Sequence, residues 1–222
     1  MLAKRSNLVA LLVLVAGTVA VAPDASATVI VSPVSGVIDA GGPGFGPISD
    51  TFNQSGLVVG FTSGVTDFDV YFAANPIHLF PFAGNEWFSN EGTSSATVTY
   101  DLGSPWTLDR LALWNEDASG IGSLTLTVSL DGIAFAPLAV YAPFDNPINV
   151  DYPAQIVSFG STTAQYVRFD MTGCPQTAEA FAACAVGEVA FSASEPVPEP
   201  GTLTLLGLGL GGLVARRRRG RS

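Results

Sequence analysis

The most regular pattern of hydrophobic and polar positions lies at residues 124–130, which read LTLTVSL. Its apolar residues share one face and its threonines and serine share the other, which is the period of a half-buried β-strand. Asp131 and Gly132 follow directly. This pair tolerates the positive φ angles of a two-residue type I′ turn, so the pattern predicts a hairpin whose return strand starts within residues 133–135.

Shorter apolar alternations recur along the chain and are separated by Gly, Pro, Ser and Thr, whereas helical periodicity is nearly absent. Residues 28–67 are expected to add two or three strands around a glycine-rich loop at 41–47. The other expected strands are residues 96–102, 108–114, 155–159, 166–171 and 187–192. Many short strands spaced by turns predict an all-β fold, a jelly-roll β-sandwich.

The N-terminal apolar run is not expected to be a strand of the sandwich. Lys4 and Arg5 precede an apolar stretch at residues 8–21, and the small residues Ala25 and Ala27 flank Ser26 just after it. This order is typical of a secretory signal with an A-x-A cleavage site. We therefore expect residues 1–27 to be a signal peptide removed by signal peptidase, so that the mature protein is secreted across the inner membrane.

The C-terminus has three parts in a fixed order: a short linker at 195–201, an apolar segment at 202–215 and an arginine-rich end at 216–222. As a helix the apolar segment spans roughly 21 Å at 1.5 Å per residue, against a hydrocarbon core of about 30 Å. It is thus expected to be a short transmembrane sorting helix. The arginines are expected to remain on the cytoplasmic side.

This tail resembles the PEP-CTERM sorting signal of Gram-negative bacteria. The residues that carry the resemblance are Pro198, Glu199, Pro200, Arg216, Arg217, Arg218 and Arg219. The resemblance implies that an exosortase recognises the chain as its substrate and removes the tail. It further implies delivery to the cell surface or to the surrounding extracellular matrix.

Charge separates the ends from the middle of the chain. Residues 28–197 hold 11 Asp and 6 Glu against only Arg110 and Arg168, a formal charge of −15. Such a surface repels nucleic acid and anionic lipid, so no nucleic-acid partner is expected. It suits neutral sugars or divalent cations, and the solubility of a secreted protein explains it equally well.

The chain has two cysteines, Cys174 and Cys184. In an oxidising compartment an even number of cysteines favours a disulfide, here one that closes a short loop. The alternatives are a metal-binding pair and a catalytic thiol.

From Trp87 onward the chain resembles the discoidin family, also called coagulation-factor type C domains, which have a galactose-binding-like jelly roll. The stretches that carry the resemblance are EWFSNEGTSSATVTYDLGSPWTLDRLALWN, LTLTVSLDGIAF, AQYVRFDM and AVGEVAFS. The resemblance implies one sandwich domain over residues 28–194. It also places Trp87, Trp106 and Trp114 in or beside the core, which is the usual role of large aromatics next to alternating strands.

Sugar binding needs an exposed aromatic side chain on a loop, together with polar groups that orient hydroxyls. The loop YAPFDNP offers Tyr141 and Phe144, and the loop after residue 114 offers Asn115, Glu116 and Asp117. The alternative for the second loop is a solvated turn. We therefore expect a non-catalytic protein that binds extracellular polysaccharide, with a structural matrix component lacking a ligand pocket as the rival hypothesis.

Related sugar-binding jelly rolls carry a structural calcium, and the resemblance places Glu188 at the ligand position on the last strand. Oxygen ligands from Asp67, Asp69 or Asn75 would complete such a site.

Catalytic motifs are absent from the sequence: it contains no G-x-S-x-G, H-E-x-x-H or P-loop. The one histidine, His78, lies in an apolar segment and is expected to be structural. A glycoside-active enzyme is the third hypothesis, and it requires two carboxylates about 5–10 Å apart.

Overall fold

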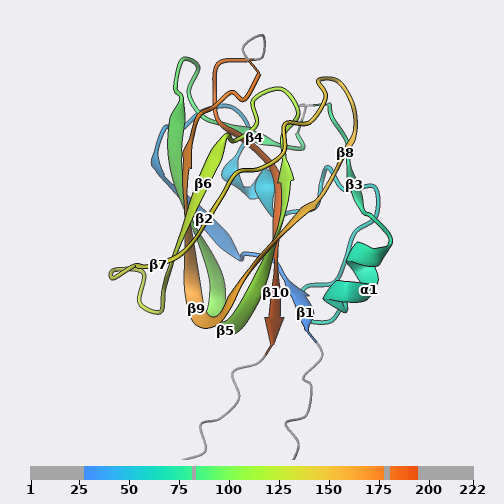
Figure 1. The fold of residues 1–222 in the computed structure, drawn as a ribbon, viewed down its shortest axis with the longest axis vertical. Coiled ribbons are helices and arrows are strands. Elements are labelled where there is room, and N and C mark those ends of the chain that lie inside the picture. The colour runs from blue at the N-terminus through green and yellow to red at the C-terminus, as the bar shows by residue number, and fades with distance from the viewer. Residues whose placement is uncertain (1–27, 82–83, 178–180, 195–222) are drawn as a thin grey trace, which may run out of the picture.

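A computed structural model describes residues 28–81, 84–177 and 181–194 of the chain (Figure 1). The predicted signal peptide, the linker and the sorting tail, including the apolar segment at 202–215, lie outside these residues. No helix within the described ranges is long and apolar enough to cross a membrane.

Two long strands organise the sandwich. They are β5 (Ser95–Asn115) and β9 (Gln155–Thr172), which pair antiparallel along most of their length. Their register shifts between Asp101 and Trp106, where both strands bend. Each long strand therefore contributes one half to each layer of the sandwich.

The first layer combines the early half of β5 and the late half of β9 with three shorter strands. These are β2 (Ser35–Ala40), β6 (Ser123–Ser129) and β7 (Ala136–Tyr141). The second layer combines the other halves with β1 (Val29–Val31), β4 (Trp87–Phe88) and β10 (Ala185–Ser194). The strands thus form two layers that pack around one core, which confirms the predicted jelly-roll β-sandwich.

Small elements lie beside the sandwich. They are the 3-10 turn η1 (Ile48–Thr51), the helix α1 (Phe68–Ala73) and a two-stranded sheet of β3 (Ile77–His78) and β8 (Tyr152–Pro153). Helix α1 is absent from the expected elements because it is only six residues long, and its N-cap Asp67 accepts from the Val70 N–H at 2.9 Å. So short a helix leaves almost no periodicity in the sequence.

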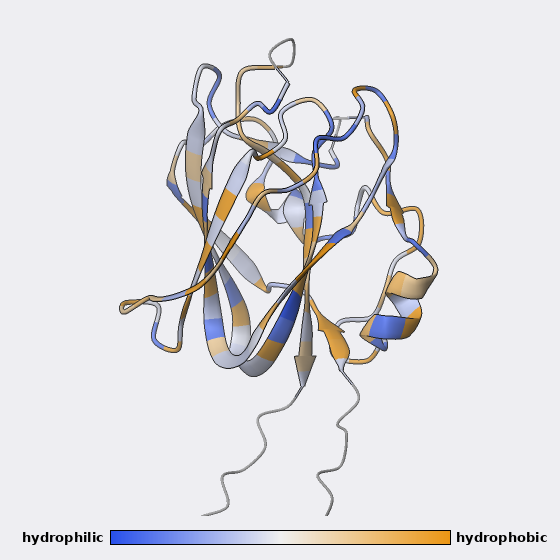
Figure 2. Ribbon diagram, viewed as in Figure 1, coloured by the Kyte–Doolittle hydropathy of each residue, from blue (hydrophilic) through white to orange (hydrophobic). Residues whose placement is uncertain are grey.

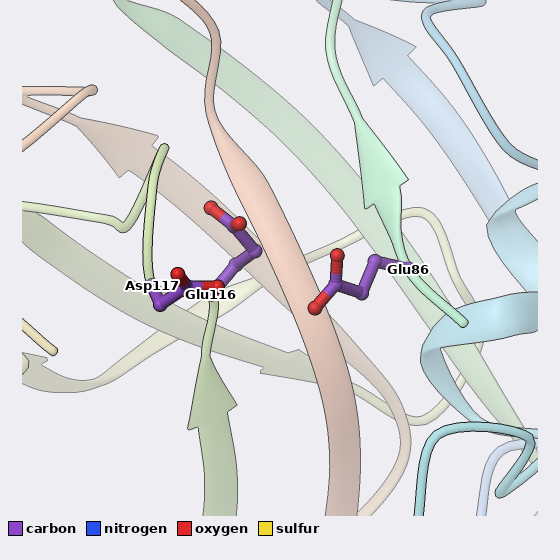
Figure 3. Close-up of side chains that lie close together, drawn as sticks. All are labelled: Glu86, Glu116 and Asp117. Carbon is purple, nitrogen blue, oxygen red and sulfur yellow. The ribbon is translucent and has the colours of Figure 1, made fainter. Parts of the chain in front are cut away.

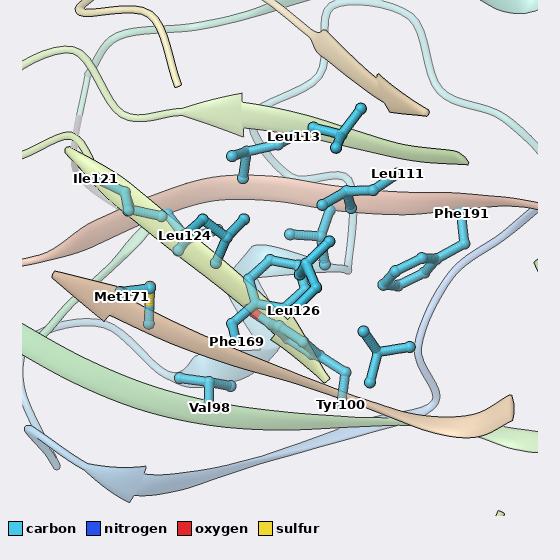
Figure 4. Packing of buried hydrophobic residues seen from close by; sticks show 14 of the residues in the cluster. Val98, Tyr100, Leu111, Leu113, Ile121, Leu124, Leu126, Phe169, Met171 and Phe191 are labelled. Carbon is cyan, nitrogen blue, oxygen red and sulfur yellow. The ribbon is translucent and has the colours of Figure 1, made fainter. Parts of the chain in front are cut away.

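The core fills the space between the layers (Figure 4). Along the strands, hydrophobic positions alternate with polar ones (Figure 2), as in β6, where Leu124, Leu126 and Val128 are buried. Phe169 of the first layer meets Phe191 of the second edge to face, with ring centroids 6.5 Å apart. Full burial of such a side chain contributes roughly 1.5–3 kcal/mol, so this alternation is what closes the sandwich.

The tryptophans lie where the resemblance placed them. Trp87 and Trp114 are fully buried, and Trp106 packs against the core while partly exposed. The indole nitrogens of Trp87 and Trp114 donate to the carbonyls of Pro43 at 3.0 Å and Pro76 at 3.1 Å. Each buried indole N–H thus has a partner and ties a loop to the sandwich.

The turn after β6 differs from the prediction. Strand β6 ends at Ser129, β7 begins only at Ala136, and Leu130 is 56% exposed instead of continuing the buried face. The Asp131 carboxylate accepts from the N–H groups of Ile133 at 2.8 Å and Ala134 at 3.0 Å. These bonds stabilise a wider loop, so the two-residue hairpin was wrong.

Two pairs of expected strands are in fact single strands. Residues 96–102 and 108–114 both belong to β5, and residues 155–159 and 166–171 both belong to β9. The glycine, serine and proline at 103–105 interrupt the alternation and therefore indicate, in the sequence, a loop between two strands. In the structure these residues lie at the bend, where pairing pauses without the strand ending.

The chain termini and the long loops lie at opposite ends of the sandwich. Val29 pairs with Ala193, so the first and last described residues leave the domain side by side (Figure 1). The loops that follow β2, β4, β5 and β9 gather at the opposite end (Figure 1). Any ligand site formed by these loops therefore faces away from the point where the tail begins.

Candidate functional site

A pocket of about 480 Å³ opens among the loops at the end opposite the chain termini. Its lining consists of aromatic rings, a proline and an alanine, two carboxylates and one asparagine. The lining residues are Phe45, Phe80, Pro81, Phe88, Glu116, Asp117, Ala118, Asn149 and Phe181. They come from six separate loops or strand ends, so the pocket exists only in the folded chain.

Exposed phenylalanine rings form the mouth of the pocket. Phe45, Phe80 and Phe181 are between 37% and 46% exposed, although large aromatics usually favour the interior. Phe181 meets Phe45 edge to face with centroids 5.5 Å apart, and it meets Phe88 in the same way at 5.9 Å. These contacts fix ring orientations while leaving ring surface open to a ligand.

The glycine-rich loop at 41–47 holds Phe45 in place. Phe45 and Phe88 exchange two backbone hydrogen bonds, of 2.8 and 2.9 Å. At Gly44, whose φ is +76°, an added Cβ would lie 1.8 Å from the Phe88 carbonyl oxygen. The close approach of the two backbones therefore requires glycine at this position.

The two pocket carboxylates follow β5 directly. Glu116 accepts from the N–H groups of Ala118, at 2.9 Å, and of Ser119. Asp117 accepts from the Asn149 N–H at 2.5 Å. Both side chains are buried beneath the mouth of the pocket, as are Ser119 and Gly120, so the alternative of a solvated turn at 115–120 is wrong.

Glu86 is a third carboxylate at this place and was not among the predicted site residues. It precedes β4, is 0% exposed, and points toward Glu116 and Asp117 (Figure 3). The Tyr152 hydroxyl donates to Glu86 Oε1 at 2.5 Å. Carboxylate oxygens of the three acidic residues lie within 4.8 Å of one another, so they form one cluster.

Burial dominates the electrostatics of this cluster. It raises the pKa of Glu86 to about 9 and the pKa of Glu116 to about 8, and it raises the pKa of Asp117 as well. The neighbouring His78 is also buried, which lowers its pKa to about 4. It stacks on Tyr152 with centroids 5.0 Å apart. A neutral, packed His78 agrees with the structural role expected from the sequence.

Asn115 lies beneath the pocket and does not line it. Its side-chain amide donates to the Phe144 carbonyl at 3.0 Å and to the Gln176 side chain at 2.8 Å. Its side-chain oxygen accepts from the Ile121 N–H at 2.8 Å. Asn115 is fully buried, and its three side-chain hydrogen bonds connect three loops.

The two aromatic residues predicted to stack on sugar are also outside the pocket lining. Phe144 is 70% exposed and Tyr141 is half-buried with its hydroxyl 3.5 Å from Gln155 Oε1. The loop that follows them reaches the pocket lining farther along, at Asn149, and its Asn146 donates to the Asn115 carbonyl at 2.6 Å. Of the predicted binding residues, Glu116 and Asp117 line the pocket, whereas Asn115, Tyr141 and Phe144 do not.

The predicted disulfide is present. Cys174 and Cys184 are bonded, with Cα atoms 4.9 Å apart. The bond closes the segment that carries Phe181 at the mouth of the pocket. It therefore restrains one of the aromatic walls.

Glu188 lies away from the pocket, next to η1. Its Oε2 accepts from the Gln54 N–H at 2.9 Å, while its Oε1 is buried with no hydrogen-bond partner among the described residues. Asp50 similarly has a buried Oδ2 with no such partner. Burial raises the pKa of both carboxyls, and Asp50 also acts on Glu188 through its charge.

Two of the expected partners of Glu188, Asp67 and Asp69, are engaged elsewhere. Asp67 caps α1, and Asp69 forms an ion pair with Arg110. The acidic neighbour of Glu188 is instead Asp50, which the sequence did not single out.

Comparison with known proteins gives one match in sequence and several in fold. Residues 196–219 match the PEP-CTERM protein-sorting motif, which confirms the resemblance of the tail. No curated protein matches the chain.

Similar solved structures are carbohydrate-binding modules and a putative chitobiase fragment. The CBM32 of AlyQ in complex with 4,5-unsaturated mannuronic acid is 18% identical, with a TM-score of 0.48, over 73% of this chain and 96% of that one. Chitosan-binding module 1 from a Paenibacillus sp. IK-5 chitosanase/glucanase is 21% identical, with a TM-score of 0.46, over 72% and 95%. The putative chitobiase fragment from Bacteroides thetaiotaomicron is 15% identical, with a TM-score of 0.47, over 82% and 100%.

Proposed function

We propose that the domain is a non-catalytic module that binds extracellular polysaccharide in the loop-end pocket. The observation that carries this proposal is the group of exposed rings, Phe45, Phe80 and Phe181, around a concave site with carboxylates at its base. A matrix protein without a ligand would have no reason to keep three large apolar rings exposed around one hollow.

The chemistry of the lining suits a sugar ring. Phenylalanine faces pack against the apolar C–H surface of a pyranose, and a few placed polar groups then fix its orientation. Glu116 and Asp117 supply such groups, and Asn149 adds an amide at the edge of the pocket. This division between apolar walls and a polar base is typical of sites that bind small polar ligands.

The position of the pocket agrees with the cell-surface location that the sorting motif predicts. The sorting motif follows the domain, and the domain ends beside β1, opposite the pocket. An exosortase substrate released or held at the cell surface through that end would present the pocket outward. We therefore propose a surface or matrix protein that contacts exopolysaccharide.

Glycoside hydrolysis is a weaker interpretation of the same carboxylates. Retaining enzymes hold two carboxyl groups about 5–5.5 Å apart on opposite sides of the bond to be cleaved, and inverting enzymes hold them farther apart. Here Glu86, Glu116 and Asp117 cluster within 4.8 Å. The cluster also lies at the base of the pocket with Glu86 fully buried, so the geometry favours binding.

We further propose that Glu188 and Asp50 hold a structural calcium. Each offers a buried carboxylate oxygen without a hydrogen-bond partner in the described structure, and calcium prefers such oxygen ligands. The ion would neutralise two buried charges and tie η1 to β10.

Capture by the host's own exopolysaccharide tests the proposed function. The purified full chain should bind, and the Phe45→Ala/Phe181→Ala variant should lose most of the bound fraction because the stacking surfaces are gone. The matched control is Tyr141→Ala/Phe144→Ala, which removes two aromatic rings that lie outside the pocket lining and should bind like wild type. A wild-type protein that captures no polysaccharide would contradict the proposal and favour a purely structural role.

A glycan array then defines the ligand class. Loss of every array signal in Phe45→Ala/Phe181→Ala, with wild-type melting behaviour, would assign binding to the pocket. Equal capture by wild type and this variant would place the sugar site elsewhere on the domain.

A further inference from the structure

Three carboxylates from two loops converge beneath the aromatic pocket, and neither of the domain's two arginines lies beside them. Within residues 28–197 the basic side chains are Arg110 and Arg168, and these pair with Asp69 and Asp39 at other sites. The nearby His78 Nδ1 lies 3.7 Å from Glu86 Oε1, beyond hydrogen-bond distance, and is 2.8 Å from the Leu79 carbonyl oxygen. The negative charge of the cluster must therefore be neutralised by protons or by a bound cation.

Glu86 supplies a separate indication that the cluster faces a ligand. It comes from a different loop than Glu116 and Asp117, it is fully buried, and its carboxylate is directed at the other two (Figure 3). Its Oε2 has no hydrogen-bond partner among the described residues. A buried carboxylate oxygen normally accepts a hydrogen bond, so this atom lacks a partner that an ion would provide.

The oxygens of the three carboxylates differ in how far they are already engaged. Hydrogen bonds already engage Oε1 of Glu86, Oε2 of Glu116 and Oδ2 of Asp117. Glu86 Oε2 has no hydrogen-bond partner among the described residues, whereas the carboxyls of Glu116 and Asp117 also hydrogen-bond each other and would exchange that contact for the ion. Calcium binds oxygen at about 2.3–2.6 Å, so ligands on opposite sides of the ion lie roughly 5 Å apart. The spread of up to 4.8 Å in the cluster matches that size.

We infer that Glu86, Glu116 and Asp117 bind one calcium ion at the base of the pocket, separate from Glu188. Calcium takes six to eight oxygen ligands in flexible geometry, whereas magnesium demands a near-ideal octahedron at shorter distances. Three protein oxygens leave positions open on the pocket side. Because Glu116 and Asp117 also line the pocket, the ion lies within reach of a bound sugar.

The ion changes what the pocket can bind, and this step rests on the proposed function. A carboxylate cluster alone repels acidic sugars, whereas a calcium ion with open positions accepts hydroxyl or carboxylate oxygens as ligands. The rings would still pack against the apolar face of the sugar. The inferred ligand is thus a polysaccharide that contributes oxygen atoms to a calcium ion.

Calorimetric titration of calcium chloride into the chelator-treated full chain tests the ion site. Glu86→Gln should bind one ion fewer than wild type, because the amide has no negative charge and binds calcium poorly. The matched control Glu91→Gln changes an exposed acidic residue and should bind as many ions as wild type. Glu188→Gln should keep the ion that Glu86→Gln loses, which separates the two sites.

Folding of the variants is checked in the same experiment. Glutamine can still accept from the Tyr152 hydroxyl, so Glu86→Gln without calcium should melt at or above the wild-type temperature. Asp117→Asn is the second variant, and it should lose the same single ion. Equal ion counts in wild type, Glu86→Gln and Asp117→Asn would overturn the inference, as would a wild type that binds no ion at millimolar calcium.

Polysaccharide capture with and without calcium separates this inference from the proposed function. Capture by wild type should depend on calcium and be lost in Glu86→Gln. Equal capture by Glu86→Gln would refute a role of the ion in holding the ligand. If no polysaccharide is captured at all while Glu86→Gln still binds one ion fewer, the proposed function fails and the ion site stands.

Discussion

Asn115→Ala provides the sharpest test of how the pocket is built. The Asn115 side chain forms three hydrogen bonds of 2.8–3.0 Å, which tie together the loop of Glu116, the loop of Phe144 and the loop of Gln176. Alanine removes all three bonds and leaves the partner groups buried. At about 1 kcal/mol for each bond, the free energy of unfolding should fall by about 3 kcal/mol. For a domain of this size the melting temperature should fall by about 6–12 °C.

Asn90→Ala is the matched control. Asn90 also bridges backbone groups of another loop, accepting from the Gly44 N–H at 2.9 Å and donating to the Gly42 carbonyl at 2.7 Å. It is exposed, so water replaces both bonds when the side chain is removed. The expected loss is therefore below about 1 kcal/mol.

Urea unfolding of the purified full chain measures both variants. A double-mutant cycle with Gln176→Ala should give a coupling of about 1 kcal/mol, since Asn115 and Gln176 form a direct bond. If Asn115→Ala loses no more stability than Asn90→Ala, the loops are held by other contacts and the assigned role of Asn115 is refuted.

Three further predictions concern the disulfide, a turn and processing. Alkylation without reductant should label neither Cys174 nor Cys184, and replacing both with alanine should lower stability by about 2–3 kcal/mol, the chain-entropy value for so short a loop. Backbone N–H groups, that of Ala134 foremost, lower the pKa of Asp131 to about 2, so its stabilising effect is complete above its ordinary pKa and is lost as pH falls from about 4 to about 2. The stability difference between wild type and Asp131→Ala in urea should shrink over that range. Intact-mass analysis of the mature surface protein should show a chain that begins at Thr28 and lacks the terminal arginine cluster, and a mass that retains the cluster would contradict tail removal.

The fold was predictable to the extent that it depends on local alternation. Leu124, Leu126 and Val128 alternate with polar residues, and a slip by one position would expose all three, so the sequence alone determines their face. The bends of β5 and β9 were not predictable in this way. Whether a glycine or proline ends a strand or bends it depends on pairing with strands that are distant in the sequence.

The site was predictable only in part, for a related reason. Glu116 and Asp117 stand out because two acids directly follow an apolar strand. Phe45, Phe80 and Phe181 do not stand out, because an apolar residue in a loop has the same appearance in sequence whether it is buried or exposed. Glu86 meets Glu116 only through the fold, since β4 and the end of β5 both lie beside β10.

The placement of the site follows from the same topology. Because β5 and β9 bend at one end of the sandwich, their four termini lie together at the other end, and the loops that continue from them meet there. The chain enters on β1 and leaves on β10 at the bend end, where Val29 pairs with Ala193. Cleavage beyond Ser194 would therefore leave Phe45, Phe181 and the carboxylates beneath them undisturbed. The sorting motif and the proposed ligand site in the loops are compatible because the described chain ends at the side of the sandwich opposite those loops.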